Sequence, residues 1–380
     1  MKPFFTLLLL FGALALPACA APPTPMISSP HLFLGLHDFT HWTRSPGAKT
    51  GEITLLSPVL EAPSGWNELI VSWNATLPAT AYLRMEASGI YGADAQNTAH
   101  QTRFYDLGHW VTDPKIHPRE SVNDQNDADG EVQTDTLILK RRGAKIQLRL
   151  TMGDDAGKTE TLASELRFIG LSFLDNTQKI APRESNRAAW GKVVAVPERF
   201  QGDYKDLGGA VWCSPTSVSM ILEHWSQIAA RPEMNLTVPQ VAAAVHDPKW
   251  SGTGNWIFNA AFAGGFPGFR AYVTRLSDLR DLETWIAAGI PVALSVNYGL
   301  LKGPGQKGGG HLVVCNGFTP TGDVVIADPG QHTEAGQKYR VFSRENVVAG
   351  WGDSHNTVYL IYPESLPVPA KSPNWDSGVK

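Results

Sequence analysis

The hydrophobic pattern of the chain changes part-way along its length, and this change limits the fold more than any other feature. From about residue 31 to 176, short runs of β-branched and aromatic residues alternate with turn formers such as Ser64-Gly65 and Asp129-Gly130. From Val193 onward, helical stripes come first and strand-like runs follow. The sequence therefore predicts an α+β protein, in which an all-β sandwich or jelly roll precedes helices packed on an antiparallel sheet.

The 380 residues exceed one ordinary domain, and the composition changes at the expected boundaries. Met1-Lys2-Pro3, an apolar run from Phe4 to Ala15 and the small residues after it are typical of a secretory signal. A polar stretch follows the β-rich part, and the chain ends in a polar, Pro-rich tail that we expect to be disordered. The predicted segments are signal 1–20, β-sandwich 31–176, linker 177–192, α+β domain 193–363 and tail 364–380.

Two cleavage sites compete at the end of the signal. Ala18-Cys19-Ala20 would release a soluble protein, whereas Leu16-Pro17-Ala18-Cys19 resembles a bacterial lipobox that would leave Cys19 lipidated. Both place the mature chain outside the cytoplasm, as a periplasmic, secreted or lipid-anchored protein. No later segment of the sequence is long and apolar enough to cross a membrane, so we expect membrane contact only through a lipid on Cys19.

Charge and cysteine content limit the binding partners and the disulfide bonds that the chain can have. A net charge of −4 without a long basic run argues against nucleic acid, and we expect a monomer. Of the three cysteines, Cys19 belongs to the signal, which leaves Cys213 and Cys315 in the folded body. Two cysteines do not make a disulfide scaffold, although these two could pair with each other.

Cys213 stands at the first turn of a predicted helix. Apolar residues from Val218 to Trp225 recur at i, i+3, i+4 and i+7, which is the pattern of a buried helix face, and Pro215 suits the first turn. The N–H dipoles that converge at a helix start favour a thiolate over a thiol. Cys213 is therefore a candidate nucleophile, and the alternative is a small buried residue with no chemical role.

A cysteine nucleophile needs a base from elsewhere in the chain. His224 lies on the same helix, but about 16 Å along its axis at about 1.5 Å per residue, too far to share a proton. His311 follows Gly308-Gly309-Gly310 and opens a strand, and Asp328 ends the next strand. If these strands pair as a hairpin, His311 and Asp328 are neighbours, and the carboxylate would orient the imidazole. The alternative for Asp328 is a role in capping a turn.

Two further kinds of residue would complete such a site. The N–H of Cys213 and the side-chain amide of Gln201 are candidate donors to an oxyanion, although a surface role for Gln201 is the alternative. Trp212, Trp250 and Trp256 would line an apolar substrate cleft, with core packing as the alternative for each.

The acidic loop from Asn123 to Gly130 is a possible cation site. In an EF-hand frame with Gly130 sixth, the first ligand would be Gln125 and the twelfth Thr136, so the frame fails. A solvated turn and an irregular cation site remain as interpretations, and we predict no metal and no cofactor for the activity.

Together these residues resemble the bacterial secreted proteins of the bacteriocin-processing-peptidase-like group, within the papain-like cysteine peptidases. The resemblance covers roughly residues 195 to 363, and implies Cys213 as nucleophile, His311 as base, Asp328 as orienting acid and Gln201 as oxyanion donor. Gln201 lies twelve residues before Cys213, a longer gap than is usual in that superfamily. The segment from Leu69 to Leu139 also resembles the β-rich N-terminal region of such proteins. The motifs that carry the resemblance are Gln201, Trp212 to Ser217, Gly254 to Asn259, Gly289 to Val292, Gly310 to Val314 and Ala327 to Pro329.

The sequence thus predicts an extracytoplasmic cysteine peptidase or amidase that cleaves a peptide or amide bond through a thioester. Two alternatives stay open. One is a catalytically idle envelope protein that binds glycan or peptidoglycan through its β-rich half, and the other is an acyltransferase that uses the same three residues.

Overall fold

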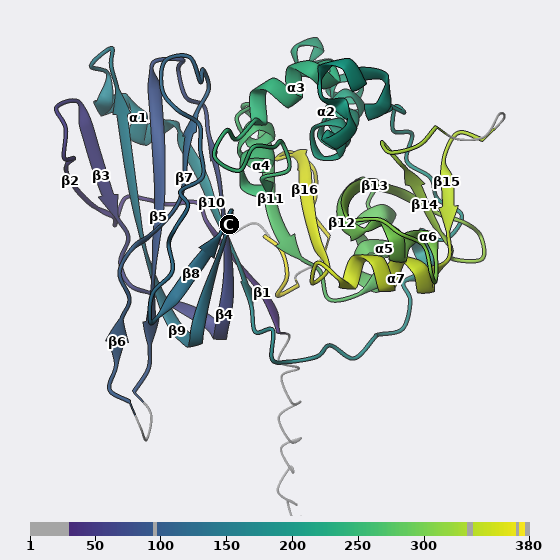
Figure 1. Cartoon of the computed structure of the whole chain (residues 1–380), viewed down its shortest axis with the longest axis horizontal. Helices are drawn as coiled ribbons and strands as arrows, with labels where there is room; N and C mark the ends of the chain where they lie inside the picture. Colours follow the sequence, from purple (N-terminus) through teal and green to yellow (C-terminus); the bar gives the residue numbers. More distant parts are fainter. Residues whose placement is uncertain (1–29, 94–96, 333–336, 370–371, 377–380) are drawn as a thin grey trace, which may run out of the picture.

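The computed structural model describes residues 30–93, 97–332, 337–369 and 372–376. The predicted signal and Cys19 lie outside the described residues. Within them the strands form two antiparallel sheets, one from the first half of the chain and one from the second, which stand side by side (Figure 1). None of the described helices combines the length and apolar character that crossing a bilayer requires.

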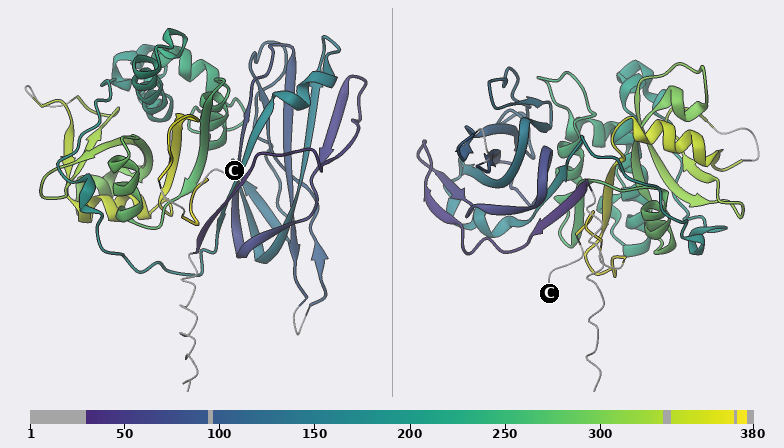
Figure 2. Two further views of the ribbon diagram at one scale, coloured as in Figure 1. Left: turned by 180° about the vertical axis from the view of Figure 1, so that it is seen from behind. Right: turned by 90° about the horizontal axis from the view of Figure 1, so that it is seen from below.

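The N-terminal sheet has ten strands among the described residues, and it is held together by one long strand. Strand β9, of 19 residues, pairs with β3, β4, β5 and β8, so it runs through the whole sheet. The view from below in Figure 2 shows the sheet curving round on itself. An antiparallel β-rich first half is confirmed, with the short helix α1 (Thr159–Glu165) as a departure from all-β, and the sandwich or jelly-roll arrangement stays a prediction. The strands are β1 (His31–Leu36), β2 (Thr43–Pro46), β3 (Glu52–Leu56), β4 (Leu60–Ala75), β5 (Ala81–Tyr91), β6 (His100–Gln101), β7 (Tyr105–Val111), β8 (Gly130–Gln133), β9 (Thr136–Asp154) and β10 (Leu166–Leu174).

The second sheet carries helices on both faces. Its strand order is β11-β16-β12-β13-β14-β15. Tyr359 of β16 contacts Ser214 of α2 through their hydroxyls, whereas Tyr362, three residues on and therefore on the other face, packs against Trp285 of α5. The strands are β11 (Phe269–Arg275), β12 (Val292–Asn297), β13 (Gly310–Phe318), β14 (Val324–Ala327), β15 (Arg340–Phe342) and β16 (Thr357–Pro363). The helices are α2 (Cys213–Ala229), α3 (Val238–Val245), α4 (Trp256–Gly264), α5 (Leu279–Ala287), α6 (Tyr298–Lys302) and α7 (Arg344–Gly352).

Side chains of β4 cover the edge strand β11 of the second sheet. The Asn74 amide donates to the carbonyl of Ala271 at 2.6 Å and accepts from its N–H at 3.1 Å, as a neighbouring strand would. The Ser72 hydroxyl accepts from the N–H of Val273 at 2.9 Å. An uncovered edge strand would leave a row of N–H and C=O groups unpaired. The two halves of the chain are therefore joined by bonds from β4 side chains to the β11 backbone as well as by a continuous apolar core.

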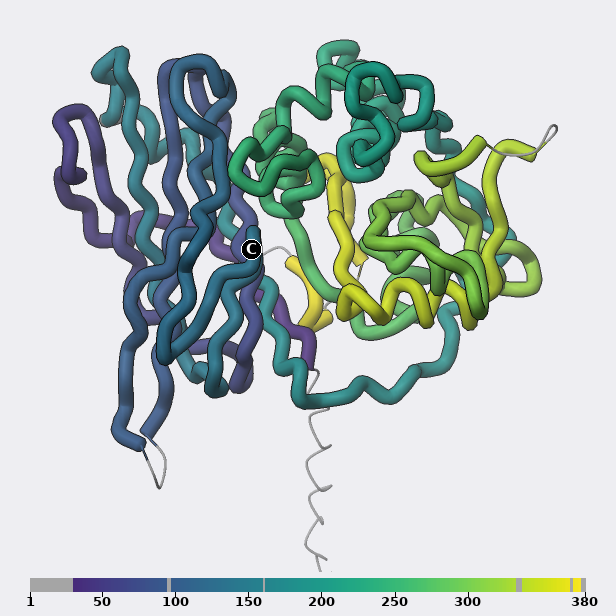
Figure 3. Tube along the Cα trace, in the orientation of Figure 1, coloured from purple at the N-terminus to yellow at the C-terminus, as the bar shows by residue number. Residues whose placement is uncertain are grey.

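The linker between the halves crosses beneath the second sheet, as the tube in Figure 3 shows. Arg183 forms an ion pair with Asp278 at 2.7 Å, and the Trp190 indole donates to Glu283 at 3.0 Å. The segment predicted as a polar linker is therefore bound along α5 by polar contacts.

The expectation of a disordered tail is wrong for residues 372–376. Trp375 is 4% exposed and packs against Trp285 with ring centroids 5.5 Å apart. The Thr274 hydroxyl donates to the carbonyl of Asn374 at 2.6 Å. A tryptophan in a polar, Pro-rich segment was the signal that the segment had apolar area to bury.

Candidate active site

Helix α2 begins at Cys213, as the sequence predicts. The first N–H groups of a helix have no partner inside the helix, and those around Cys213 point toward its thiol. Burial alone would raise the pKa of the Cys213 thiol. A hydrogen bond from His311 and its charge, together with the N–H groups of Leu312 and Ser214, instead lower that pKa below its usual value. Cys213 is a half-buried residue on the border of a cavity.

Strands β13 and β14 pair as the predicted hairpin, with Val314 opposite Ala327. This register brings His311, near the start of β13, and Asp328, just after β14, to the same end of the sheet. The Nε2 atom of His311 lies 3.0 Å from Oδ1 of Asp328, which leaves Nδ1 as the ring nitrogen for the thiol. Burial disfavours the charged imidazole, but hydrogen bonds to Asp328 and Cys213 outweigh this and raise the pKa of His311 to about 9.

Asp328 is held by two side chains that the sequence reasoning missed. The Tyr298 hydroxyl donates to Oδ2 of Asp328 at 2.7 Å, and Nη1 of Arg340 lies 2.7 Å from the same oxygen. Arg340 also donates to the Tyr298 hydroxyl at 2.9 Å, and the Tyr298 ring packs on His311 with centroids 4.3 Å apart. Burial opposes ionisation of Asp328, yet His311 and Tyr298 keep its pKa below the usual value.

Gly330 passes directly over the His311–Asp328 pair. A Cβ at this position would lie 2.8 Å from Nε2 of His311 and 3.2 Å from Oδ1 of Asp328. The N–H of Gly330 donates to Oδ1 of Asp328 at 2.8 Å. The backbone can therefore make this contact only because residue 330 has no side chain.

Gln201 lies between Cys213 and the segment that follows Asp328. Its N–H donates to the carbonyl of Pro329 at 2.9 Å, and its side-chain Nε2 donates to the carbonyl of Ala210 at 2.7 Å. An amide nitrogen carries two hydrogens, so the bond to Ala210 leaves one of them, and Gln201 lines a cavity. Two 3₁₀ turns, 201–207 and 209–211, take up the twelve-residue gap and return the chain to Cys213.

These residues border a cavity of about 890 Å³ that we call the interdomain cleft. Gln201, Cys213 and His311 lie on its border, and Trp250, which is 45% exposed, and Trp256 line it as expected. Trp212 is not among the described residues that line the cleft. Its ring packs toward Tyr204 instead, with centroids 6.4 Å apart, because Trp212 precedes the helix and turns the other way. The expectation for Trp212 is therefore wrong.

Three other sequence interpretations can now be judged. Cys213 and Cys315 are both free, and burial raises the pKa of the Cys315 thiol, which fits a structural residue. In the acidic loop, Oδ1 of Asp127 accepts from the Tyr105 hydroxyl at 2.6 Å and from the N–H of Asp129 at 2.9 Å, so this carboxylate closes a turn. Within the described ranges, no three His, Cys, Asp or Glu side chains gather in a way that could hold a metal ion.

The arrangement can generate a nucleophile and an acid at neutral pH. A lowered thiol pKa and a raised imidazole pKa both favour the thiolate–imidazolium pair. Gln201 and Cys213, the two predicted oxyanion donors, both line the same cavity, and their role stays a prediction.

Comparison with protein families agrees with this geometry. Residues 193–359 match the peptidase C39-like family, and residues 43–171 match the peptidase C39 N-terminal domain. Each half of the chain is thus similar to a part of the peptidase C39-like proteins. The family resemblance drawn from the sequence is thus confirmed. Among solved structures, a Bacillus anthracis protein described as a C39-like peptidase is similar, with 16% identity, a TM-score of 0.35, and coverage of 45% of this chain and 97% of that one. A comparison with curated proteins gives no match.

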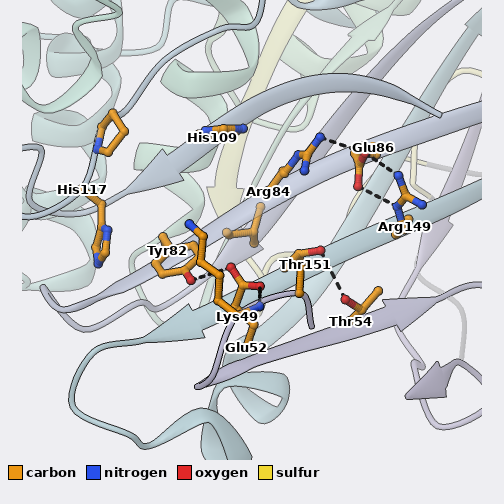
Figure 4. A pocket seen from close by; sticks show the side chains of 13 residues that line it. Lys49, Glu52, Thr54, Tyr82, Arg84, Glu86, His109, His117, Arg149 and Thr151 are labelled. Carbon is orange, nitrogen blue, oxygen red and sulfur yellow. Dashed lines mark hydrogen bonds and ion pairs between the residues drawn. The ribbon is translucent and has the colours of Figure 1, made fainter. Parts of the chain in front are cut away.

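A second cavity of this C39-like protein lies on the N-terminal sheet, and we call it the sheet pocket. It has a volume of about 500 Å³, and its charged side chains bond to one another (Figure 4). Arg149 donates twice to Glu86, at 2.7 and 2.6 Å, and the Tyr82 hydroxyl donates to Glu52 at 2.7 Å. The lining residues that Figure 4 labels are Lys49, Glu52, Thr54, Tyr82, Arg84, Glu86, His109, His117, Arg149 and Thr151.

Proposed function

We propose that this chain is an extracytoplasmic cysteine peptidase or amidase that hydrolyses a peptide or amide bond through Cys213, His311 and Asp328. The observation that carries the proposal is the continuous line from thiol to imidazole to carboxylate, on the border of a cleft of about 890 Å³. The match of residues 193–359 to the peptidase C39-like family supports the same activity.

In the first half of the reaction, the Cys213 thiolate attacks the carbonyl carbon of the substrate. The carbonyl oxygen becomes an oxyanion, which the N–H of Cys213 and the second hydrogen of the Gln201 amide stabilise. The imidazolium of His311 then gives its Nδ1 proton to the leaving nitrogen, the C–N bond breaks, and a thioester forms on Cys213.

In the second half, neutral His311 takes a proton from water as the water attacks the thioester. The thiolate leaves, the imidazolium is restored, and the acid product is released. Asp328 keeps the imidazole in the orientation and tautomer that both halves need. The hydrogen bonds of Asp328 to Tyr298, Arg340 and Gly330 keep it ionised while it does so.

The proposed location rests on the signal-like segment 1–20 and on Cys19, which lie outside the described residues. It is tested separately, by fractionation of cells that express the full chain.

The activity is tested by digesting a peptide library with the intact protein and with the Cys213→Ala variant, and by mass spectrometry of the products. We expect cleavage by the intact protein alone. Cleavage that persists in the variant, or a library left intact by both proteins, would contradict the proposal. Addition of an amine separates hydrolysis from acyl transfer, because transfer yields a new amide instead of an acid.

A further inference from the structure

The interdomain cleft is closed at one end by the N-terminal domain. Glu68 of β4 and Ile138 of β9 face each other across paired strands, and both line the cleft. The turn between β8 and β9, residues 133–136, lines it as well. A substrate in the cleft is thus bordered by the catalytic residues at one end and by the other domain at the far end.

The distance between the two ends follows from the strand order. His311 pairs with Val296 in β12, and Arg275 pairs with Thr357 in β16. Both residues therefore lie near the same end of the strands in the second sheet. Three strand spacings separate β13 from β11. At about 4.8 Å each they cover about 14 Å. An extended peptide spans that distance with about four residues, at about 3.3 to 3.6 Å per residue.

The β8–β9 turn is held at the cleft by a strained backbone at one residue and by a buried hydrogen bond at the next. Thr134 has a φ of 59°, in the left-handed region that residues other than glycine adopt at a cost. The next residue, Asp135, is buried, and its Oδ2 accepts from the N–H of Trp256 at 2.6 Å. Burial raises the pKa of Asp135 to about 6. The turn and the first residue of α4, which also lines the cleft, therefore form one wall.

Arg275 supplies unused hydrogen-bond donors at this far end. Its side chain is 3% exposed, lines the cleft and donates from Nη2 to Glu68 at 2.8 Å. Its Nε and Nη1 find no acceptor among the described residues. Since Glu68 already balances the charge of Arg275, a neutral acceptor such as a peptide carbonyl suits these donors better than another carboxylate.

We propose that the cleft binds an extended polypeptide that runs from Cys213 to the N-terminal domain, and that residues 133–136 contact this chain about four residues from the bond that is cut. The inference rests on the proposed function, because it assigns the substrate class to the same site. The N-terminal domain is then part of the substrate-binding surface of the enzyme.

Two series of alkylating peptides test this on the full-length protein. Acetyl-oligoalanine chloromethyl ketones extend from the thiol toward the acyl side, and iodoacetyl-oligoalanine amides extend toward the amine side. In both, the thiolate forms a C–S bond and halide leaves, so no turnover is required. We expect the alkylation rate in one series to rise about tenfold as the peptide grows from two to about five alanines.

The role of the β8–β9 turn is tested by the ratio of the alkylation rate with long peptides to the rate with short peptides, measured within each protein. The double variant Gln133→Ala, Thr134→Gly shortens two of the four side chains of residues 133–136, which line the cleft, and relieves the backbone at residue 134, and we expect it to lose the gain with length. Ala230→Gly relieves a left-handed residue, with a φ of 52°, at the opposite end of α2, and is expected to keep the gain. Flat rates in both series, or a gain that the double variant retains, would overturn the inference.

A failure of the proposed function looks different, because Cys213 would then react slowly even with iodoacetamide. In that case a decapeptide library carrying a benzophenone side chain is cross-linked to the Cys213→Ala variant. Cross-links on residues 133–138 support the inference without any thiol chemistry, and their absence there contradicts it.

Discussion

The interdomain cleft and the sheet pocket are both lined with polar groups, but these groups are bonded in opposite ways. In the sheet pocket, Glu86 is 2% exposed and its two oxygens bind Arg149, while Arg84 lies 3.1 Å from one of them. In the cleft, the Gln201 amide gives one hydrogen to Ala210, and the thiol of Cys213, whose pKa is lowered, hydrogen-bonds to His311, whose pKa is raised.

The difference separates polar groups that stabilise from polar groups that react. Charged groups that satisfy one another hold strands together and leave little for a ligand to gain. A group that is poised for chemistry needs a partner that shifts its pKa and a side that stays open. By this criterion the sheet pocket is a structural network and the cleft is the candidate reaction site.

The sharpest comparison removes one carboxylate charge from each cavity. In Asp328→Asn the amide can donate to Nε2 of His311 and fix the wrong tautomer, so we expect kcat/KM to fall by about 10³ to 10⁴ with little change in stability. In Glu86→Gln, Arg149 loses its charged partner and Arg84 keeps only Asp106, and we expect the free energy of unfolding to fall by about 1 to 2 kcal/mol, since both arginines are partly exposed.

Peptide hydrolysis and denaturant unfolding of both variants check this prediction. The loss of activity should be confined to Asp328→Asn, and kcat/KM of Glu86→Gln is expected to stay close to that of the parent protein. A Glu86 variant that loses activity while it stays folded would show that the sheet pocket takes part in the reaction.

The second comparison concerns pH. The lowered pKa of Cys213 keeps the thiolate present at pH values where an ordinary thiol is protonated, so alkylation by iodoacetamide should persist at pH 6. The raised pKa of His311 keeps the imidazolium present up to about pH 9, so hydrolysis should fall as the pH rises through that value, because the leaving nitrogen loses its acid. Alkylation needs no acid and should not fall there.

His311→Ala removes the partner that lowers the thiol pKa, and burial then raises it. We expect the alkylation rate at pH 6 to drop by about a hundredfold, as the thiolate fraction falls. An unchanged rate in this variant would mean that the thiol is activated without His311. Alkylation of Cys315 is the internal reference, because burial keeps its thiol protonated.

The third comparison uses two glycines. Gly330→Ala places a Cβ against His311 and Asp328, and we expect kcat/KM to fall about tenfold or more as the pair is pushed apart. Gly352→Ala, at the end of α7, meets no atom within 4 Å and should leave the rate unchanged. Both φ values lie outside the left-handed region, so a backbone effect does not separate the two variants.

The sequence predicted the parts of the site that depend on local pattern. The helix start placed Cys213 at free N–H groups, and the hairpin pairing brought His311 to Asp328. The sequence predicts Ser277 as the capping residue of α5, but in the structure the next residue, Asp278, is the N-cap and accepts from the N–H groups of Arg280 and Asp281. Such shifts are expected where two capping residues are adjacent.

Contacts between distant segments could not be predicted from spacing. Tyr298 and Arg340 reach Asp328 from α6 and from an edge strand, and no periodicity marks them. Asp135 and Glu68 border the cleft because β4 covers β11, which is a packing of two domains. The gap after Gln201 gave no helical or strand pattern, because 3₁₀ turns fill it.

The smallest expected effects come from the groups that hold Asp328. Tyr298→Phe removes one hydrogen bond to Oδ2, and Arg340→Gln removes a positive charge 2.7 Å from it. Each change leaves the carboxylate freer to stabilise the imidazolium, so the pKa of His311 should rise and the fall in hydrolysis should move above about pH 9. Poorer orientation of His311 should lower kcat by about two- to fivefold.

Arg340→Lys is the matched control for charge. It keeps the cation but not the fork that reaches both Asp328 and the Tyr298 hydroxyl. We expect Lys to restore the position of the alkaline limb but not the full kcat. If Arg340→Gln lowers stability and leaves the pH profile in place, Arg340 supports the fold of β15 and has no influence on His311. The charge of Arg340 would then not act through Asp328 on the imidazole and the thiol.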